Sequence, residues 1–388
     1  MEAAGKGRRA VHEQLLGLDV VRFVAALMVM SFHLAYWSWA KPDSPTAAIS
    51  GGTAFPALEP VAWFGWVGVQ IFFVVSGFVI ALTANGATPV DFLRRRVIRL
   101  YPAAWICATI TLAAWLALGS SDARSLVVPY LHSIVLFPQA PWIDGSYWTL
   151  GVEISFYGVI FLLLCCNAFR HVTAVAGALA GLSAAYWLFE QVSQLHLHNQ
   201  QVFKLTLAPH GCHFALGMML WLVVTRGWTP ARAGVIALAL GAGVLQIIGE
   251  VATKTAETGQ AHAAWAPVLT WLAMVGVIAL SSAWNARILP VARGWAPGIR
   301  LIGLMTYPLY LLHDVVGAGV MGLLRSAGVG PEAALAAAIL VCIAASFAVA
   351  AWLEPALQRW LRFALGRVVA LAAYVRLFQF LFRSTRTA

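Results

Sequence analysis

The sequence predicts an all-α polytopic membrane protein with about ten transmembrane helices and with both termini in the cytoplasm. The first observation is composition: of 388 residues, 61% are hydrophobic and only 10% are charged, whereas about 25% of residues are charged in a soluble domain. The second is a succession of apolar segments, each close to the length of about 20 residues that crosses a bilayer. The third is an uneven distribution of lysine and arginine between the loops.

The apolar segments define the predicted spans and leave no room for a sizeable soluble domain. The spans are expected at 18–39, 64–84, 101–119, 148–166, 171–189, 209–225, 233–250, 265–283, 301–324 and 333–354. The first is too long for the core of a cleaved signal peptide, so we expect a retained anchor. A further helical or re-entrant stretch is expected around 126–138. One transmembrane domain over 1–358 should therefore precede a basic amphipathic tail over 359–388, which lies on the inner leaflet.

The lysines and arginines predict the orientation of these spans. With ten spans and an inner N-terminus, the inner segments hold 19 of the 25 Lys and Arg residues and the outer loops hold 5, with Arg22 inside the first span. Cytoplasmic loops of membrane proteins carry such an excess. The same bias explains the formal net charge of +10, so the basic segments are expected to contact membrane lipids rather than nucleic acid.

The five cysteines do not indicate a disulfide framework or a metal centre. Two of them are adjacent, most lie in apolar runs, and none has the spacing of a zinc site. A group formed by His210, Cys212 and His213 has a helical spacing that prevents all three side chains from converging on one ion. We expect free cysteines and no metal.

Two polar residues in the first span, Arg22 and His33, share one face of a helix. Eleven residues at 100° each return to within about 20° of the starting direction, and they separate the two side chains by about 16 Å along the axis. Arg22 is therefore expected near the cytoplasmic end and His33 in the outer half. Arg22 can alternatively extend to the inner headgroups, and His33 can alternatively be a structural histidine bonded to another helix.

Glu153 is expected at about the same depth as His33. Its span enters from the outside, which places the carboxylate about five residues below the outer rim, and His33 lies about six residues below that rim. A carboxylate beside an imidazole orients it and raises its basicity. The alternative is a purely structural Glu–His pair.

Two other places carry unusual polarity. Near mid-membrane, His313 and Asp314 follow Pro308, which should loosen the helix, and His313 is expected either to bind substrate or to be structural. In the first inner loop, Arg96 and Arg99 lie one turn apart and can together hold a phosphate. The alternative for these arginines is anchoring to the inner leaflet.

Polarity at two depths suits a linear donor with phosphates at one end and a reactive group at the other. Coenzyme A is such a molecule: its phosphates would lie by Arg22, Arg96 and Arg99, and its pantetheine arm would reach towards His33. The rise of about 16 Å between Arg22 and His33 is of the order of that arm's length.

Several segments resemble motifs of the acyltransferase-3 family of membrane O-acyltransferases, and the resemblance covers nearly the whole chain. The first-helix motif of Arg, ten residues and His is matched by LDVVRFVAALMVMSFH, and the second-helix motif by VGVQIFFVVSGFVIAL. The Arg-x-x-Arg-x-x-Pro segment is matched by RRRVIRLYPAAW, and the Trp-x-Leu-x-x-Glu stretch by YWTLGVEISFY. Later helices are matched by FALGMM and YPLYLLH. Each motif alone is weak, but their order and spacing together are specific.

The resemblance implies transfer of an acyl group, usually acetyl, from cytoplasmic acyl-CoA to a hydroxyl. The acceptors would be glycans or small molecules outside the cytoplasm, and the location would be a bacterial inner (cytoplasmic) membrane. It implies that Arg22 and His33 are essential, that Arg96 and Arg99 contact the donor, and that Glu153 belongs to the active site. Self-association into a homo-oligomer stays open.

The chain also departs from the family pattern. Ile154 replaces the usual second glutamate, which removes any role for that carboxylate, and Phe23 replaces the usual glycine after the arginine. Within the matched stretches we assign Trp148, Tyr307 and His313 to substrate binding.

Two questions remain open at the level of sequence. The expected reaction is direct transfer, in which His33 takes the hydroxyl proton, and its rival is an acyl-histidine intermediate. The alternative function is a transporter or flippase of a polar or lipid-linked substrate, since central polar residues also suit a permeation path.

Overall fold

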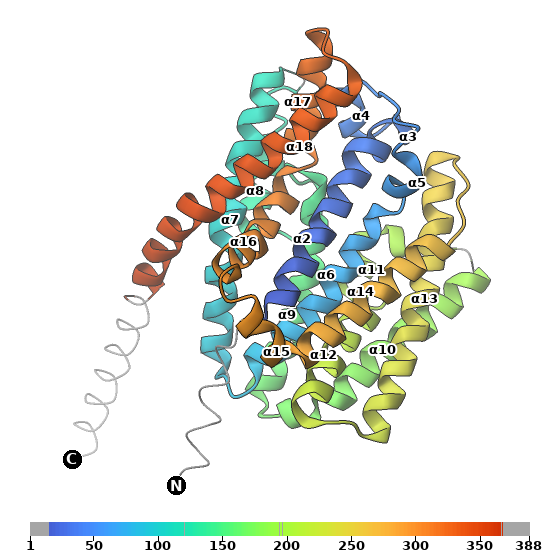
Figure 1. The fold of residues 1–388 in the computed structure, drawn as a ribbon, viewed down its shortest axis with the longest axis vertical. Helices are drawn as coiled ribbons and strands as arrows, with labels where there is room; N and C mark the ends of the chain where they lie inside the picture. The colour runs from blue at the N-terminus through green and yellow to red at the C-terminus, as the bar shows by residue number, and fades with distance from the viewer. Residues whose placement is uncertain (1–14, 120, 194, 196, 366, 368–388) are drawn as a thin grey trace, which may run out of the picture.

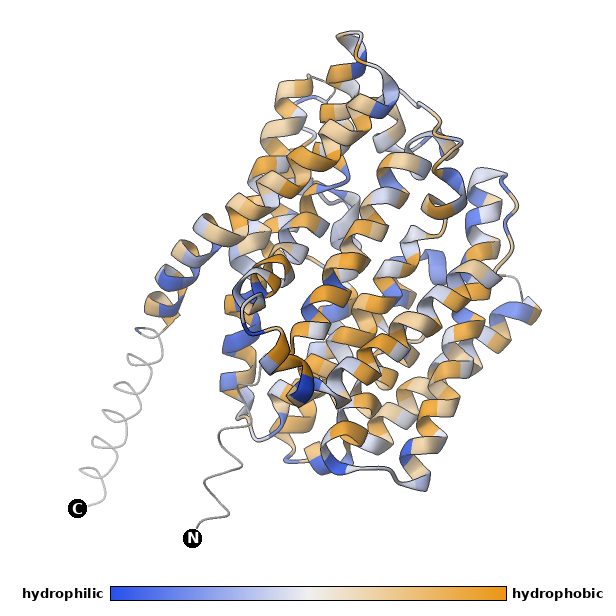
Figure 2. Ribbon diagram, in the orientation of Figure 1, coloured by the Kyte–Doolittle hydropathy of each residue, from blue (hydrophilic) through white to orange (hydrophobic). Residues whose placement is uncertain are grey.

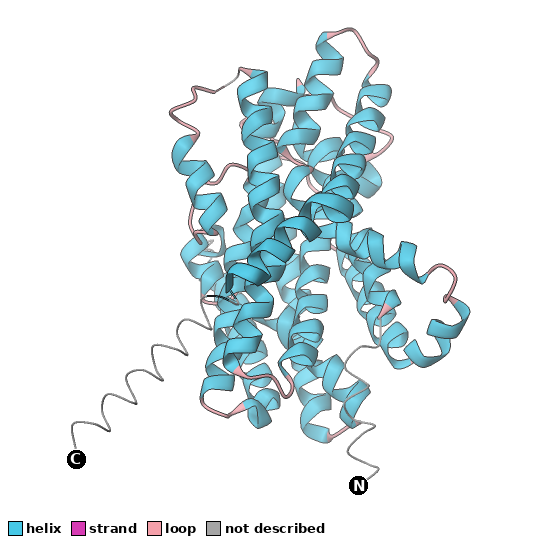
Figure 3. Cartoon of the chain, turned by 90° about the vertical axis from the view of Figure 1, so that its left-hand side faces the viewer, coloured by secondary structure: helices cyan, strands magenta, loops and turns pink. Residues whose placement is uncertain are grey.

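The computed structural model describes residues 15–119, 121–193, 195, 197–365 and 367. These residues form helices joined by loops and turns, and no strand occurs among them. Figure 3 shows the helices running roughly side by side. The all-α prediction is thereby confirmed.

The long helices and their extensions follow the chain in a simple order. They are α2 (Leu16–Ser31), continued by the π-helical η2 (Phe32–Trp37) and α3 (Ser38–Ala40), then α6 (Gly68–Ala84), α7 (Pro89–Leu118), α9 (Trp148–Cys165), α10 (Val172–Ser193), α12 (Gly211–Arg226), α13 (Pro230–Thr258), α14 (Trp265–Ala283), α16 (Ala296–Leu312), α17 (Val315–Ser326), α18 (Pro331–Ala348) and the π-helical η7 (Val349–Leu353).

Short helices fill the connections between the long ones. They are α4 (Pro45–Ser50), α5 (Glu59–Ala62), α8 (Val127–Val135), α11 (Gln201–Leu205) and α15 (Asn285–Val291), together with short 3-10 turns. The stretch expected around 126–138 is thus the short helix α8. It lies against α7, where Nε1 of Trp105 donates a hydrogen bond to the carbonyl oxygen of Ile134 at 2.8 Å.

All ten predicted spans fall on helices, with two differences in form. Eight helices in the described part of the chain are long and apolar enough to cross a membrane. A ninth span is the bent pair α16 and α17, whose axes differ by 68°. The tenth, α12, has only 16 residues, but it is buried along nearly its whole length. Partner helices therefore cover most of its surface.

Local sequence explains where the two longest single helices begin and end. Thr88 accepts a hydrogen bond from the backbone N–H of Asp91 and is followed by Pro89, so α7 begins with a side-chain cap and a proline in its first turn. Its last residue is followed by Gly119 at φ +61°, a conformation that suits glycine. The helix α13 has the same arrangement, with a threonine cap at its start and a glycine at its end.

Small residues bring the central helices into close contact. A Cβ atom on Gly217 of α12 would meet the backbone oxygen of Val74 of α6, and one on Gly77 would meet the backbone oxygen of Phe214. Such close approach is how helices associate in a bilayer, where burial of apolar surface drives them together less than in water. Figure 1 shows α2 and α6 in the middle of the bundle, with α10, α13 and α18 towards its edges.

The hydropathy pattern agrees with a position in a membrane. Large apolar side chains such as Leu162, Val277 and Leu340 are exposed on the outside of the bundle, and Figure 2 shows apolar residues over most outward helix faces. The beginning of α2 and the beginning of α7 lie towards the same end, the lower one in Figure 1.

The predicted basic tail is described only in its first part. Helix continues from η7 to Leu365. Residues 366 and 368–388 lie outside the described residues, as do residues 1–14. The tail's position on the inner leaflet stays a prediction.

Candidate active site

A cavity of about 130 Å³ lies within the bundle between α2, α6, α7, α9 and α16. Its charged lining residues are Arg22, Arg96, Arg99 and Glu153. The three arginines thus come from two different helices and face one space, together with a single carboxylate. The cavity carries an excess of positive charge.

Arg96 and Arg99 are held at the cavity by neighbouring polar and aromatic groups. Nη2 of Arg96 donates to Oγ1 of Thr83 at 3.3 Å, and its guanidinium lies 5.8 Å from the ring centre of Tyr157. Nη1 of Arg99 lies 3.0 Å from Oε1 of Glu354, and its guanidinium lies 5.3 Å from the ring centre of Tyr307. The three-residue spacing puts both arginines on one face of α7.

One donor in this group has no partner within the protein. Nε of Arg96 is buried and makes no hydrogen bond to any described residue. An unpaired buried donor of a cationic group is costly. Together with the charge excess, it indicates that the cavity is built to hold an anion.

Arg22 lies on the first span, where it faces the cavity. Its side chain is half-buried and lines the same space as Arg96 and Arg99. The structure therefore brings together the three arginines that the sequence assigned to the donor.

Glu153 lies on the wall of the cavity and not beside His33. Its Oε1 accepts a hydrogen bond from Oγ of Ser76 on α6 at 2.7 Å. No hydrogen bond or ion pair joins Glu153 to His33 among the described residues. The expected contact is thus not formed, because similar depth places two side chains at one level but does not turn their helices towards each other.

His33 instead contacts His313. Nδ1 of His33 lies 2.8 Å from Nε2 of His313, and the two ring centres are 4.8 Å apart. His33 is part of the π-helical segment η2, and π-helical turns occur often at functional sites. His33, expected in the outer half of the first span, and His313, expected near mid-membrane in another span, therefore form one pair.

His313 and Asp314 are at the break between α16 and α17. The sequence located the weak point of this span at Pro308, but α16 continues through that residue to Leu312. The bend is held by carboxyl groups: Oδ2 of Asp144 accepts the backbone N–H of Val315 at 3.2 Å, and Asp314 accepts a hydrogen bond from Thr46. The carboxyl of Asp144 thus satisfies one of the N–H groups that have no partner within the helix at the start of α17.

Asp144, in the loop before α9, is part of this arrangement and was not found from the sequence. Its other oxygen accepts from the backbone N–H and the hydroxyl of Ser146. Burial, and after it the neighbouring carboxyl of Asp314, raise the pKa of Asp144 to about 6. Its position in a loop carries no signal that would identify it as buried.

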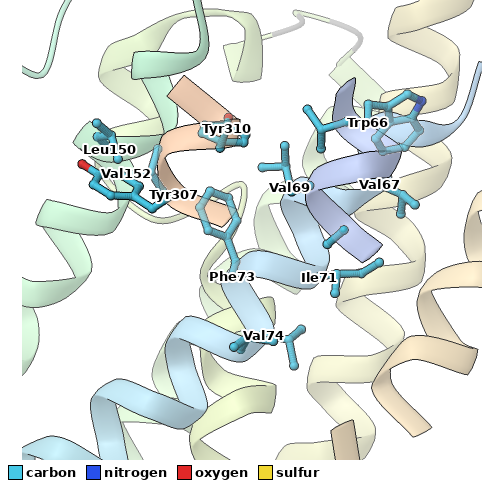
Figure 4. Close-up of a cluster of buried hydrophobic side chains, with 14 of the residues drawn as sticks. Trp66, Val67, Val69, Ile71, Phe73, Val74, Leu150, Val152, Tyr307 and Tyr310 are labelled. Carbon is cyan, nitrogen blue, oxygen red and sulfur yellow. The ribbon is translucent and has the colours of Figure 1, made fainter. Parts of the chain in front are cut away.

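Aromatic side chains form another part of the cavity lining. Phe72, Phe73, Tyr307 and Tyr310 line it, and Figure 4 shows Phe73, Tyr307 and Tyr310 brought together with Leu150 of α9. The ring of Tyr310 lies 5.7 Å from that of His313. The cavity thus extends from the arginines to a residue that contacts the histidine pair.

Of the other predicted substrate residues, Tyr307 lines the cavity and Trp148 does not. The centre of the Trp148 ring lies 6.5 Å from that of Phe73, a lining residue, and Nζ of Lys204 lies 4.2 Å from the centre of the Trp148 ring. Glu354, the partner of Arg99, was missed. Its signal was available, since a carboxylate next to an apolar span is itself unusual.

A metal centre is not seen in the part of the chain that the structure describes. No group of three or more His, Cys, Asp and Glu side chains there is arranged to hold an ion. The described cysteines are all free.

Comparison with known proteins identifies the family. A family model described as an acyltransferase domain, that of acyltransferase-3, matches residues 15–354. No solved structure matches the chain at a significant level.

Curated relatives give the same result. The chain is 26% identical over 288 residues to the exopolysaccharide production protein ExoZ of Rhizobium meliloti, which covers 71% of this chain and 84% of that protein. It is 27% identical over 351 residues to the acyltransferase MdmB of Streptomyces mycarofaciens, with 84% and 87% covered. BcsY of Komagataeibacter xylinus, whose name describes a membrane-bound transacylase, is 28% identical over 64% of this chain and 65% of its own length. With its match over residues 15–354 and its bundle of apolar helices, the chain belongs to the acyltransferase-3 family and is an integral membrane acyltransferase.

Proposed function

We propose that the protein transfers an acyl group, in the simplest case acetyl, from cytoplasmic acyl-CoA to a hydroxyl group of a glycan on the other side of the membrane. The observation that carries the proposal is the cavity that gathers three arginines and reaches Tyr310, whose ring lies 5.7 Å from that of His313, the partner of His33. The names of two relatives support parts of the proposal: an exopolysaccharide production protein supports a glycan acceptor, and an O-acetyl transferase of Shigella phage Sf6 supports transfer of acetyl to oxygen.

The arginine end suits the phosphates of the donor. Guanidinium groups bind phosphate through paired hydrogen bonds, and Arg96 retains an unpaired buried N–H. Three cations against one carboxylate in the lining favour a ligand with more than one negative charge. Tyr307, which faces the same space, would contact the arm of the donor.

The histidine end suits the reacting groups. We propose that His33 takes the proton of the acceptor hydroxyl while its oxygen attacks the thioester carbonyl. The new carbon–oxygen bond forms, the carbon–sulfur bond breaks, and the proton on His33 passes to the leaving thiolate. Holding both substrates in one cavity converts their encounter into an intramolecular step.

Glu153 keeps a place in this proposal, but as a residue of the cavity wall and not as the partner that orients His33. Because its carboxylate is bound to Ser76 on α6, we assign it to balancing the arginine charge and to fixing the cavity wall. Trp148, outside the lining and beside Lys204, is assigned to the acceptor side.

The difference between the two ends of the bundle in basic residues also suggests how the protein is oriented in the membrane. The lower end in Figure 1 holds the beginning of α7, with Arg94 and Arg95 exposed next to the donor arginines. We propose that this end faces the cytoplasm of a bacterial inner membrane, where acyl-CoA is made. The excess of lysine and arginine in the segments on this side supports the assignment.

The test is transfer of label by the purified full chain in lipid nanodiscs. The protein is incubated with acetyl-CoA carrying a labelled acetyl group and with a de-O-acetylated bacterial exopolysaccharide, and the polysaccharide is analysed by mass spectrometry. We expect acetyl esters with the wild type and a loss of about 10²-fold or more with His33→Ala, the range of a general base.

Two results would change the proposal. Full transfer by His33→Ala would contradict it. Label trapped on the wild-type protein, at His33, would favour the acyl-histidine route over direct transfer.

A further inference from the structure

His33 and His313 are joined through one ring nitrogen each, and the remaining contacts of both rings are known. Nδ1 of His313 lies 2.8 Å from the carbonyl oxygen of Tyr310 and 3.2 Å from that of Leu309. Nδ1 of His33 lies 3.1 Å from the carbonyl oxygen of Val29. These contacts decide where the protons are.

The proton of neutral His313 must be on Nδ1. A carbonyl oxygen only accepts hydrogen bonds, so a ring nitrogen that faces two carbonyls must be the donor. A neutral imidazole has one N–H, and the other nitrogen then has a lone pair. Nε2 of His313 is therefore an acceptor, and it faces Nδ1 of His33 at 2.8 Å.

The proton of neutral His33 must then also be on Nδ1. That nitrogen faces two acceptors, Nε2 of His313 and the carbonyl oxygen of Val29. Nε2 of His33 has the lone pair, and none of the described residues makes a hydrogen bond to it. His33 is half-buried, whereas His313 is fully buried at 0% exposure.

We propose that His313 is a positioning residue that fixes His33 in the Nδ1–H tautomer, so that Nε2 of His33 is the atom that accepts the hydroxyl proton. The inference rests on the proposed function, in which His33 is the base. It corrects the expectation that His313 binds substrate, because both nitrogens of that ring are already engaged and its side chain is closed to the cavity.

The surroundings keep His313 in place and stabilise the proton that His33 takes up. His313 follows directly on α16, and the hydrogen bonds of Asp144 to Val315 and of Thr46 to Asp314 hold the bend beside it. Protonated His33 would donate from Nδ1 to Nε2 of His313 through a charge-assisted hydrogen bond. The charged groups nearest the pair are the carboxyls of Asp144 and Asp314 and, on α13, the ammonium of Lys254.

The tautomer can be measured directly by ¹⁵N NMR on histidine-labelled protein in nanodiscs, without any activity. The His33 signals are identified by their loss in His33→Asn. We expect the Nδ1–H form in the wild type and a mixture with the Nε2–H form in His313→Leu. The Nε2–H form in the wild type, or an unchanged tautomer in His313→Leu, would overturn the proposal, the latter because the Val29 carbonyl alone would then suffice.

Kinetics separate positioning from substrate binding. A histidine held in the wrong tautomer loses its role as base, so His313→Leu should lower kcat by about 10²–10³-fold and change KM for acetyl-CoA and acceptor by less than about twofold. His313→Gln should recover at least about tenfold of this loss, because its amide oxygen can accept from Nδ1–H of His33. A raised KM for the acceptor with unchanged kcat would instead assign His313 to substrate binding and overturn the proposal.

His213→Leu is the matched control. His213 is equally buried, at 0% exposure, and contacts Gln246 on α13 instead of His33. We expect the specific activity of the folded control variant to be close to wild type, which separates loss of the pair from loss of a buried imidazole. Should the tautomers behave as expected while the wild type transfers no acyl group, the proposed function would fail and the positioning of His33 would stand.

Discussion

Nη1 of Arg99 and Oε1 of Glu354 lie 3.0 Å apart and join α7 to the helix that follows the π-helical segment η7. Glu354 is 3% exposed, and Gln358 donates a second hydrogen bond to the same oxygen at 2.8 Å. The other oxygen, Oε2, is buried without a partner in the described chain. Glu354 therefore fixes one of the three cations of the cavity from a helix that contributes no residue to the lining.

Removing this carboxylate should weaken donor binding more than chemistry. In Glu354→Ala, Arg99 loses the partner that holds it towards the cavity, so we expect KM for acetyl-CoA to rise by about 5–30-fold, which corresponds to about 1–2 kcal/mol. Steady-state kinetics measure this, with kcat expected to stay within about threefold. Glu354→Gln keeps an acceptor for Arg99, so its KM for acetyl-CoA should lie between those of the wild type and Glu354→Ala. A fall of kcat without a rise of KM in either variant would contradict the role of Glu354 in positioning Arg99.

The orientation can be tested with the natural cysteines. Cys165 and Cys166 are exposed at the end of α9, whereas Cys107, Cys212 and Cys342 are buried. We expect a membrane-impermeant maleimide to label inverted membrane vesicles and not intact spheroplasts. Labelling of intact spheroplasts would reverse the proposed orientation.

A matched control shows that the reagent reaches the outer side. Asp43 is exposed in the loop after the first span, and the predicted topology places this loop on the outer side. In a variant with Cys165→Ser and Cys166→Ser, Asp43→Cys should be labelled in intact spheroplasts.

The contact between α6 and α12 should be sensitive to a single methyl group. A Cβ on Gly217 would meet the backbone of α6, which cannot move aside as a flexible side chain can. We expect Gly217→Ala to destabilise the protein by about 1–3 kcal/mol, the range for overpacking, and to lower the thermal unfolding midpoint in detergent. Gly181→Ala is the control, since no heavy atom lies within 4 Å of a Cβ at that position; an equal loss in both variants would contradict the packing argument.

Asp144 should make stability depend on pH. Burial and the neighbouring carboxyl of Asp314 raise its pKa from the ordinary 3.8 to about 6, so the folded protein holds this proton more tightly than the unfolded chain. The resulting stabilisation is complete below about pH 4 and is lost as the pH rises through about 6. It amounts to about 2–3 kcal/mol, because each pKa unit corresponds to about 1.4 kcal/mol.

Thermal unfolding between pH 4.5 and 7.5 measures this slope. The amide side chain introduced by Asp144→Asn cannot titrate, so the unfolding midpoint of this variant should depend less on pH. Its altered hydrogen bonds can shift the midpoint at every pH without changing this slope. Asp43→Asn, at an exposed loop residue, should keep the wild-type slope. If Asp144→Asn kept it too, another group would be responsible.

The positions of the helices could be predicted from the sequence because hydropathy and span length determine them. Even α12, at 16 residues, was found, since residues 214–224 form one apolar run. The bend at His313 and Asp314 was not predicted; the sequence indicated only that Pro308 should loosen the helix. A proline predicts a missing hydrogen bond, but here the bend depends on Asp144 and Thr46, which are distant in the sequence.

The pairing of the site residues could not be predicted from the sequence. Helix rise predicts a similar depth in the outer half for His33 and Glu153 and a position near mid-membrane for His313, but the rotation of each span about its axis depends on packing against its neighbours. His33 therefore meets His313, and Glu153 meets Ser76. That the three arginines share one site was easier to predict. Cations near one membrane face avoid lipid by turning towards the interior of the bundle, where they meet.

The central claim is that the arginines of the cavity bind the donor while His33, which lies beyond the lining and contacts His313, serves the chemistry. Equilibrium binding of CoA to two variants tests it most directly. We predict that His33→Ala binds CoA with wild-type affinity although it transfers no acyl group. We predict that Arg96→Gln binds CoA at least about tenfold more weakly, as expected for a lost charge-assisted hydrogen bond. Weak binding by His33→Ala, or wild-type binding by Arg96→Gln, would contradict the account.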